Sequence, residues 1–101
     1  MGRSALPPEV VRVIEAVPVA WSRHAADAAD RLWLDSADVV AAARAAVEWK
    51  READELGEAV DGWKDSIVGR DTSGRRLYLT GKTVYYRGEK RWYVITIHEA
   101  A

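Results

Sequence analysis

The stretch that decides the fold is Arg75–Glu99, which reads RRLYLTGKTVYYRGEKRWYVITIHE. Its alternation of apolar and polar residues is typical of half-buried β-strands. The dipeptides Gly81-Lys82 and Gly88-Glu89 each predict a two-residue hairpin turn, and Asp71–Gly74 predicts a type I turn with glycine in the left-handed position. The sequence therefore predicts four antiparallel strands, at about 66–70, 75–80, 83–87 and 90–98.

Two-residue turns also fix the register of the predicted sheet. They pair Tyr78 with Tyr85 and Tyr85 with Trp92, so these three rings form one row. The face that carries the row gathers the candidate binding residues, which are Arg76, Tyr78, Tyr85, Arg87, Lys90, Trp92 and Thr96, and it continues to His98. The other face collects Leu77, Leu79, Val84, Tyr86, Tyr93, Ile95 and Ile97, and we expect it to pack against helices.

The residues before the sheet have the signals of helices. Pro7 and Pro8 suit a first helical turn, Ser22 is a candidate N-cap for a second helix, and Asp35 or Ser36 caps a third. The third pattern continues to about residue 56, and Gly57 is a plausible end. We predict a single α+β domain over residues 1–101, in which two to three helices within about residues 8–56 pack on one face of a four-stranded antiparallel sheet within about residues 66–98.

Composition limits the function classes. The chain has 101 residues and no cysteine, which excludes disulfides and thiol chemistry. No apolar run approaches the length of a membrane span, so we expect a cytoplasmic protein that makes no contact with membranes. Residues 1–63 carry seven Lys and Arg against twelve Asp and Glu, whereas residues 64–101 carry eight against four. The basic half suggests a polar partner, although the two halves could also simply attract each other.

The predicted row of rings and cations has the composition of a surface for single-stranded RNA. Unstacked bases lie on aromatic rings while arginine and lysine meet the phosphates. His24 and His98, the only histidines, are candidates for general acid and base work in RNA cleavage without a metal. Alternatively, both histidines have structural or surface roles, and Trp92 and Tyr85 bury against the first helix or a second subunit. Two histidines without matched carboxylates do not predict a metal site, and we expect no cofactor.

Four short motifs resemble an uncharacterised domain family whose members begin with a His-Ala helix. The motifs are Ser22-Arg23-His24-Ala25, Leu34-Asp35-Ser36-Ala37-Asp38-Val39, Gly74-Arg75-Arg76-Leu77 and Val94-Ile95-Thr96-Ile97. The resemblance covers roughly residues 20–99, and that family looks related in architecture to the small RelE/BrnT-like toxin ribonucleases of toxin–antitoxin systems. It implies helices before an antiparallel sheet whose open face binds RNA. Family members carry arginines at the positions of Ala28 and Leu32 and a glycine at the position of Trp33.

Two functions from different classes therefore compete. The first is an RNA-directed, toxin-like protein, with or without endoribonuclease activity, whose partner is an antitoxin-like protein or a target. The second is a non-catalytic protein-binding or inhibitory module that uses the same face. A homodimer with the aromatic row at its interface is a third interpretation.

Overall fold

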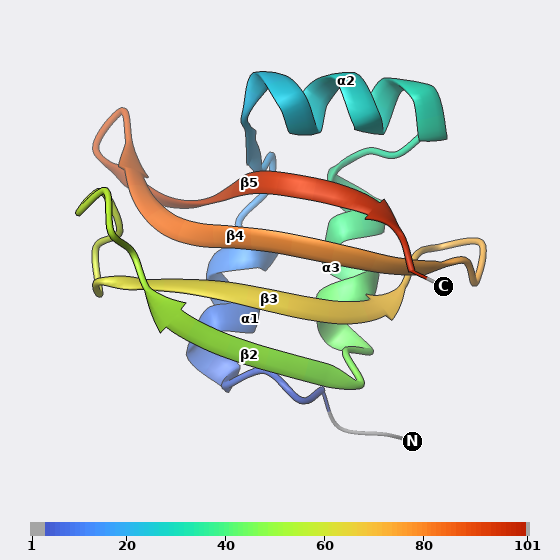
Figure 1. The fold of residues 1–101 in the computed structure, drawn as a ribbon, viewed down its shortest axis with the longest axis horizontal. Helices are drawn as coiled ribbons and strands as arrows, with labels where there is room; N and C mark the ends of the chain where they lie inside the picture. Colours follow the sequence, from blue (N-terminus) through green and yellow to red (C-terminus); the bar gives the residue numbers. More distant parts are fainter. Residues whose placement is uncertain (1–3, 101) are drawn as a thin grey trace.

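The computed structural model describes residues 4–100 and has three helices packed on a five-stranded sheet (Figure 1). The strand order is β1-β5-β4-β3-β2, in which β1 runs parallel to β5 and every other pair is antiparallel. The prediction of an α+β fold with a largely antiparallel sheet is confirmed, but a four-stranded sheet is wrong, because the predicted strands 75–80 and 83–87 form the single β4 and because β1 and β2 extend the sheet on both sides. The elements are α1 (Pro8–Glu15), β1 (Ala20–Trp21), α2 (Arg23–Leu32), α3 (Ser36–Arg44), β2 (Glu48–Ala53), β3 (Trp63–Arg70), β4 (Arg76–Tyr86) and β5 (Glu89–Glu99).

The helices leave one face of the sheet uncovered. In Figure 1, α1 and α3 lie behind the sheet, and α2 runs beside β5 near its edge. The core lies between the sheet and the two rear helices, with Ile14, Val39, Ile67, Leu77, Leu79, Trp92, Val94 and Ile97 among its buried side chains. At Gly69, an added Cβ would come within 2.1 Å of the Ala42 carbonyl oxygen, so only glycine allows α3 to lie so close to β3. Within residues 4–100, no helix is long and apolar enough to cross a membrane.

The predicted helix N-caps at Ser22 and Asp35 are confirmed. Ser22 Oγ accepts a hydrogen bond from the Ala25 amide and donates one to the Ile95 carbonyl, which attaches α2 to β5. Asp35 forms a reciprocal capping box with Asp38 at the start of α3. Asp38 also accepts hydrogen bonds from the backbone and hydroxyl of Thr72 in the β3–β4 turn. Burial would raise the pKa of Asp38, but these hydrogen bonds outweigh it and hold the pKa below the usual value.

Asp71 organises the β3–β4 turn from inside. Its buried carboxylate accepts hydrogen bonds from Ser73 and from the backbone and side chain of Arg75, and Arg75 also donates to the Leu32 carbonyl at the end of α2. Burial favours a higher pKa for Asp71, but the hydrogen bonds from Arg75 and Ser73 lower it overall. The turn predicted at Asp71–Gly74 is thereby confirmed, with Gly74 at φ 87°.

The prediction of a helix up to residue 56 is wrong, because α3 ends at Arg44 and β2 follows. Glu, Lys, Arg and Ala favour helices, so local propensity pointed the wrong way. The strand is held by distant partners: Trp49 Nε1 and Arg51 Nε both donate to the buried carboxylate of Asp65 in β3, at 2.9 and 2.8 Å. Tertiary contacts outweigh helix propensity here.

The prediction of a turn at Gly81-Lys82 is also wrong. β4 runs unbroken through both residues, and a bulge shifts its register with β5 between Thr80 and Gly81. The glycine is needed for another reason, because an added Cβ would lie 2.6 Å from the Trp92 ring. The buried Trp92 indole therefore packs directly against the backbone of Gly81.

The last hairpin turns one residue earlier than predicted. Arg87 and Gly88 have φ values of 51° and 80°, and Tyr86 pairs with Glu89 across them. Positive φ at both central residues is the pattern of a type I′ turn. Thr83 consequently pairs with Trp92, and Tyr85 with Lys90. The predicted row of Tyr78, Tyr85 and Trp92 does not exist, and the residues of β4 after Gly81 occupy the opposite faces from those predicted.

Candidate functional site

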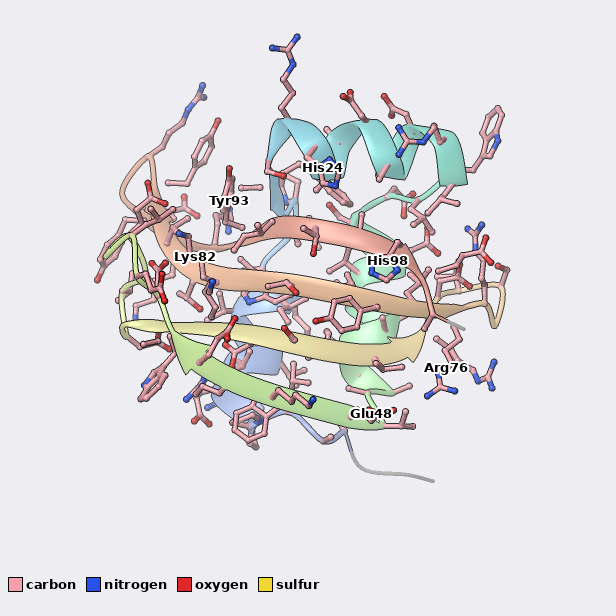
Figure 2. The ribbon with its side chains drawn as sticks, in the orientation of Figure 1. His24, Glu48, Arg76, Lys82, Tyr93 and His98 are labelled. Atoms are coloured by element: carbon pink, nitrogen blue, oxygen red, sulfur yellow. The ribbon has the colours of Figure 1, made fainter. Side chains whose placement is uncertain are left out.

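The uncovered side of β2–β5, called here the open face, is the candidate site. Side chains alternate along each strand, so residues between the core positions point to this side. Figure 2 shows Arg76, Lys82, Tyr93 and His98 on it. Among the predicted binding residues, Arg76, Tyr78 and Thr96 lie on the open face, together with His98. The register thus places these four residues on one face of the sheet, as predicted, and their role in binding stays a prediction.

Tyr78 and His98 form the most distinctive feature of the open face. They are register partners on β4 and β5, and their rings stack with centroids 5.0 Å apart and planes 23° apart. The nearby Ser66 and Thr80 hydroxyls lie 3.0 Å from each other. Hydrogen bonding by Ser66 and then Thr80 lowers the pKa of the Tyr78 phenol, and the charge of Lys50 adds to this effect. His98 Nδ1 lies 2.9 Å from its neighbour's carbonyl oxygen at Glu99.

Most cations of the open face are already paired with carboxylates. Arg76 forms a salt bridge with Glu48 at 3.0 Å, and Lys64 forms one with Glu52 at 3.5 Å. The side chains of both pairs are partly exposed. Within residues 4–100, Lys50 forms no ion pair, and its charge is close enough to Tyr78 to lower the pKa of that phenol. Exposed pairs of this kind are weak, and a polyanion can compete for their cations.

Lys82 lies on the open face but is buried under residues 54–62. Its ammonium group contacts the Asp54 carboxylate at 3.2 Å and Glu58 at 2.7 Å. Asp54 also accepts hydrogen bonds from the amides of Glu58 and Ala59, which folds the segment back on itself. Desolvation would lower the pKa of Lys82, but its bonds to Glu58 and Asp54 raise it overall. The Lys82 ammonium group therefore stabilises the fold and is not available to a ligand.

Several predicted site residues lie elsewhere. Trp92 is fully buried in the core, where its Nε1 has no hydrogen-bond partner, so it cannot touch a partner. Tyr85 and Lys90 are register partners on the helix side of the sheet, and Arg87 is in the hairpin turn. His24 is exposed in the first turn of α2, on a different element from His98 (Figure 2).

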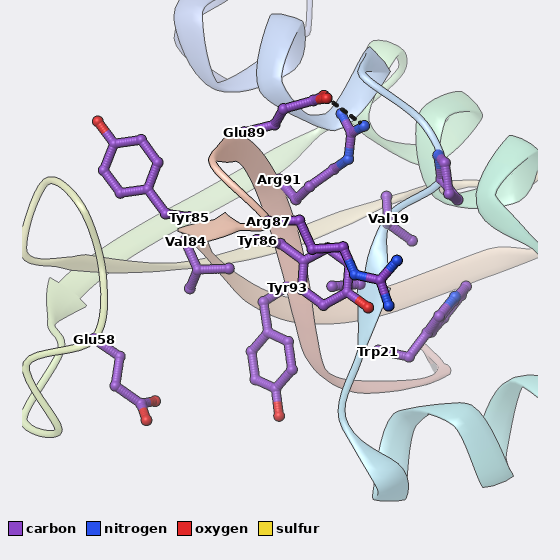
Figure 3. A pocket seen from close by; sticks show the side chains of 12 residues that line it. Val19, Trp21, Glu58, Val84, Tyr85, Tyr86, Arg87, Glu89, Arg91 and Tyr93 are labelled. Carbon is purple, nitrogen blue, oxygen red and sulfur yellow. Dashed lines mark hydrogen bonds and ion pairs between the residues drawn. The ribbon is translucent and has the colours of Figure 1, made fainter.

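A groove beside the β4–β5 hairpin was missed from the sequence. It has a volume of about 870 Å³, and its lining includes the aromatic rings of Trp21, Tyr86 and Tyr93 (Figure 3). An unbroken β4 puts Tyr86 on the same face as Tyr78, whereas the turn predicted at Gly81-Lys82 placed it on the other face. No sequence pattern indicates that Trp21 lies beside β5, because its strand is only two residues long and pairs with β5 in parallel.

Within residues 4–100, no three His, Asp or Glu side chains are grouped so that they could hold a metal ion. Comparison of the chain with protein-family models, with curated proteins and with solved structures finds no match.

Proposed function

We propose that this protein binds single-stranded RNA along the open face of its sheet, as expected from its resemblance to an uncharacterised domain family that looks related to the RelE/BrnT-like toxin ribonucleases. The observation that carries the proposal is the stacked pair of Tyr78 and His98 on an uncovered sheet face, with the charge of Lys50 close enough to lower the pKa of the Tyr78 phenol. An exposed ring offers a platform for an unstacked base, and the cation offers a contact for the adjoining phosphate.

The ion pairs of the open face set the expected strength of binding. RNA must compete with Glu48 for Arg76 and with Glu52 for Lys64. Few phosphates are therefore neutralised without cost, and affinity should fall with salt along a shallow slope. Stacking supplies the larger share of the binding energy in this proposal.

The same stack supports metal-independent cleavage as the catalytic form of the function. One group removes the proton from a ribose 2′-hydroxyl, O2′ bonds to phosphorus, the P–O5′ bond breaks, and the second group protonates O5′. His98 and the Tyr78 phenol, whose pKa is lowered, are adjacent groups that can divide these two transfers. The products would be a 2′,3′-cyclic phosphate and a free 5′-hydroxyl.

Binding is tested by fluorescence anisotropy with a labelled single-stranded oligoribonucleotide. Tyr78→Ala and His98→Ala should each weaken binding roughly tenfold, which corresponds to the loss of one base–aromatic contact. Trp33→Ala is the matched control, because this exposed ring lies at the end of α2 and not on the sheet. Equal affinity for all four proteins would refute the proposal.

Cleavage has a separate readout. His98→Ala should abolish formation of the cyclic phosphate, whereas His24→Ala should leave it unchanged, because His24 is on α2 rather than in the stack. Intact RNA after incubation with the wild-type protein would refute the catalytic form and leave the binding proposal to the anisotropy result.

A non-catalytic protein-binding module remains the second candidate, and its partner would be an antitoxin-like protein, a target or a second copy. The pairing of Arg76 with Glu48 and of Lys64 with Glu52 favours it, because a nearly neutral face suits a protein surface. This candidate predicts no affinity for RNA and a complex that survives high salt.

A further inference from the structure

We propose that the groove beside the β4–β5 hairpin is a nucleotide subsite, in which a base stacks on aromatic rings and its phosphate meets Arg87. The inference rests on the proposed RNA function, because it names where one nucleotide of the strand is held. The subsite uses residues other than Tyr78 and His98, so the subsite and the RNA function can be refuted separately.

Three rings from three strands supply the stacking surface. Trp21 comes from β1, Tyr86 from β4 and Tyr93 from β5, and Figure 3 shows them turned toward the same space. Tyr86 keeps half of its surface exposed. A tyrosine exposed to this extent has a ring face that a ligand can cover, and nucleobases stack on such faces regardless of sequence.

The groove has one cation without a carboxylate partner. Glu89 is bonded to Arg91 at 2.8 Å, and Glu58 contacts Lys82 at 2.7 Å in an ion pair that Lys82 shares with Asp54, so each carboxylate of the groove already has a cation beside it. The Arg87 guanidinium lies over the Tyr86 ring at 5.4 Å from its centroid, and within residues 4–100 it pairs with no carboxylate. One free guanidinium beside aromatic rings matches a ligand with a planar base and a phosphate.

The size and position of the groove fit one unit of a longer strand. Its volume of about 870 Å³ lies within the range of small-ligand sites. Tyr86 and Tyr78 are on the same face of β4, and at about 3.3 Å per residue they are roughly 26 Å apart. An extended single strand that crosses the Tyr78–His98 stack can therefore continue to the groove.

The test uses adenosine 5′-monophosphate as the probe and ¹⁵N–¹H NMR of the full chain. Addition of the nucleotide should shift the amide signals of Ala20, Tyr86 and Tyr93. Tyr86→Ala and Arg87→Gln should each weaken binding roughly tenfold, and adenosine without phosphate should bind about as weakly as the nucleotide binds to Arg87→Gln. Trp33→Ala is the matched control, because this ring is 92% exposed and does not line the groove.

Two results would overturn the subsite: no shifts at the groove, or equal affinity of the nucleotide for wild type, Tyr86→Ala and Arg87→Gln. If oligoribonucleotide binding still depends on Tyr78 in that case, the RNA function stands without the subsite. If the nucleotide binds to the groove as expected but no oligoribonucleotide binds to the protein, the subsite stands and the RNA function fails. Arg87→Gln alters only an exposed turn residue, so it keeps the test valid if Tyr86→Ala unfolds.

Discussion

The substitution Gly81→Ala tests the packing that separates this fold from the one predicted by turn signals. The new Cβ would lie 2.6 to 2.7 Å from three atoms of the Trp92 indole, well inside the 3.5 to 4.0 Å of an ordinary carbon contact. Trp92 is fully buried and has little room to move. Overpacking of this kind costs about 1–3 kcal/mol, and we expect about 2 kcal/mol here.

The assay is urea unfolding followed by circular dichroism. With a slope of about 1–3 kcal/mol per M, the midpoint for Gly81→Ala should fall by roughly 1 M. Trp92→Leu alone should also destabilise, because it leaves a cavity. In the double variant the leucine makes room for the new methyl group, so the total loss should be smaller than the sum of the two single losses by at least about 1 kcal/mol.

The double variant is the decisive part of the experiment. If Gly81 were the first residue of a type II′ turn, its replacement by alanine would strain the backbone whatever residue stood at position 92. The two losses would then simply add. Additive losses, or a Gly81→Ala protein as stable as wild type, would refute the contact between Gly81 and Trp92.

Three further predictions concern stability. Trp33 has φ 58° and is 92% exposed, so Trp33→Gly should raise the free energy of unfolding by about 1 kcal/mol, while the equally strained Trp33→Ala should not; urea unfolding measures both. Asp38 and Asp71 have pKa values lowered in the folded state, so the stability that they contribute is present above about pH 4 and is lost as the pH falls through the folded pKa values. Urea unfolding midpoints measured from pH 6 downward should show this loss. Asp71→Asn should make the loss smaller. Lys82→Met should speed amide exchange in the segment that covers it, whereas Lys64→Met, which breaks an exposed pair, should not; equal exchange in both variants would contradict the buried role of Lys82.

The sequence was informative where local chemistry decides the structure. Ser22 and Asp35 cap helices through their own side chains, and Leu77 and Leu79 alternate with polar neighbours along β4. β2 could not be found in this way, because Asp65, which holds Trp49 and Arg51, belongs to another strand. The turn predicted at Gly81-Lys82 is wrong for a similar reason, because Gly81 packs against Trp92 of another strand.

The candidate site was predictable only in part, because a change of one residue in register exchanges the two faces of a strand. Tyr78 and its register partner His98 lie on the Arg76 side of the bulge. The error in the predicted register therefore did not change their face. Gly81 serves a ring and not a turn, and that fact requires knowledge of where Trp92 packs. The groove depends on the same unseen register, so Tyr86 was assigned to the core.

An NMR titration of the ¹⁵N-labelled protein with a single-stranded oligoribonucleotide shows whether RNA lies on the open face. We expect shifts of the Tyr78, Thr80, Thr96 and His98 amides, which saturate together and weaken in Tyr78→Ala. Shifts confined to α1 and α3 on the opposite side of the sheet, or no shifts at all, would contradict this expectation.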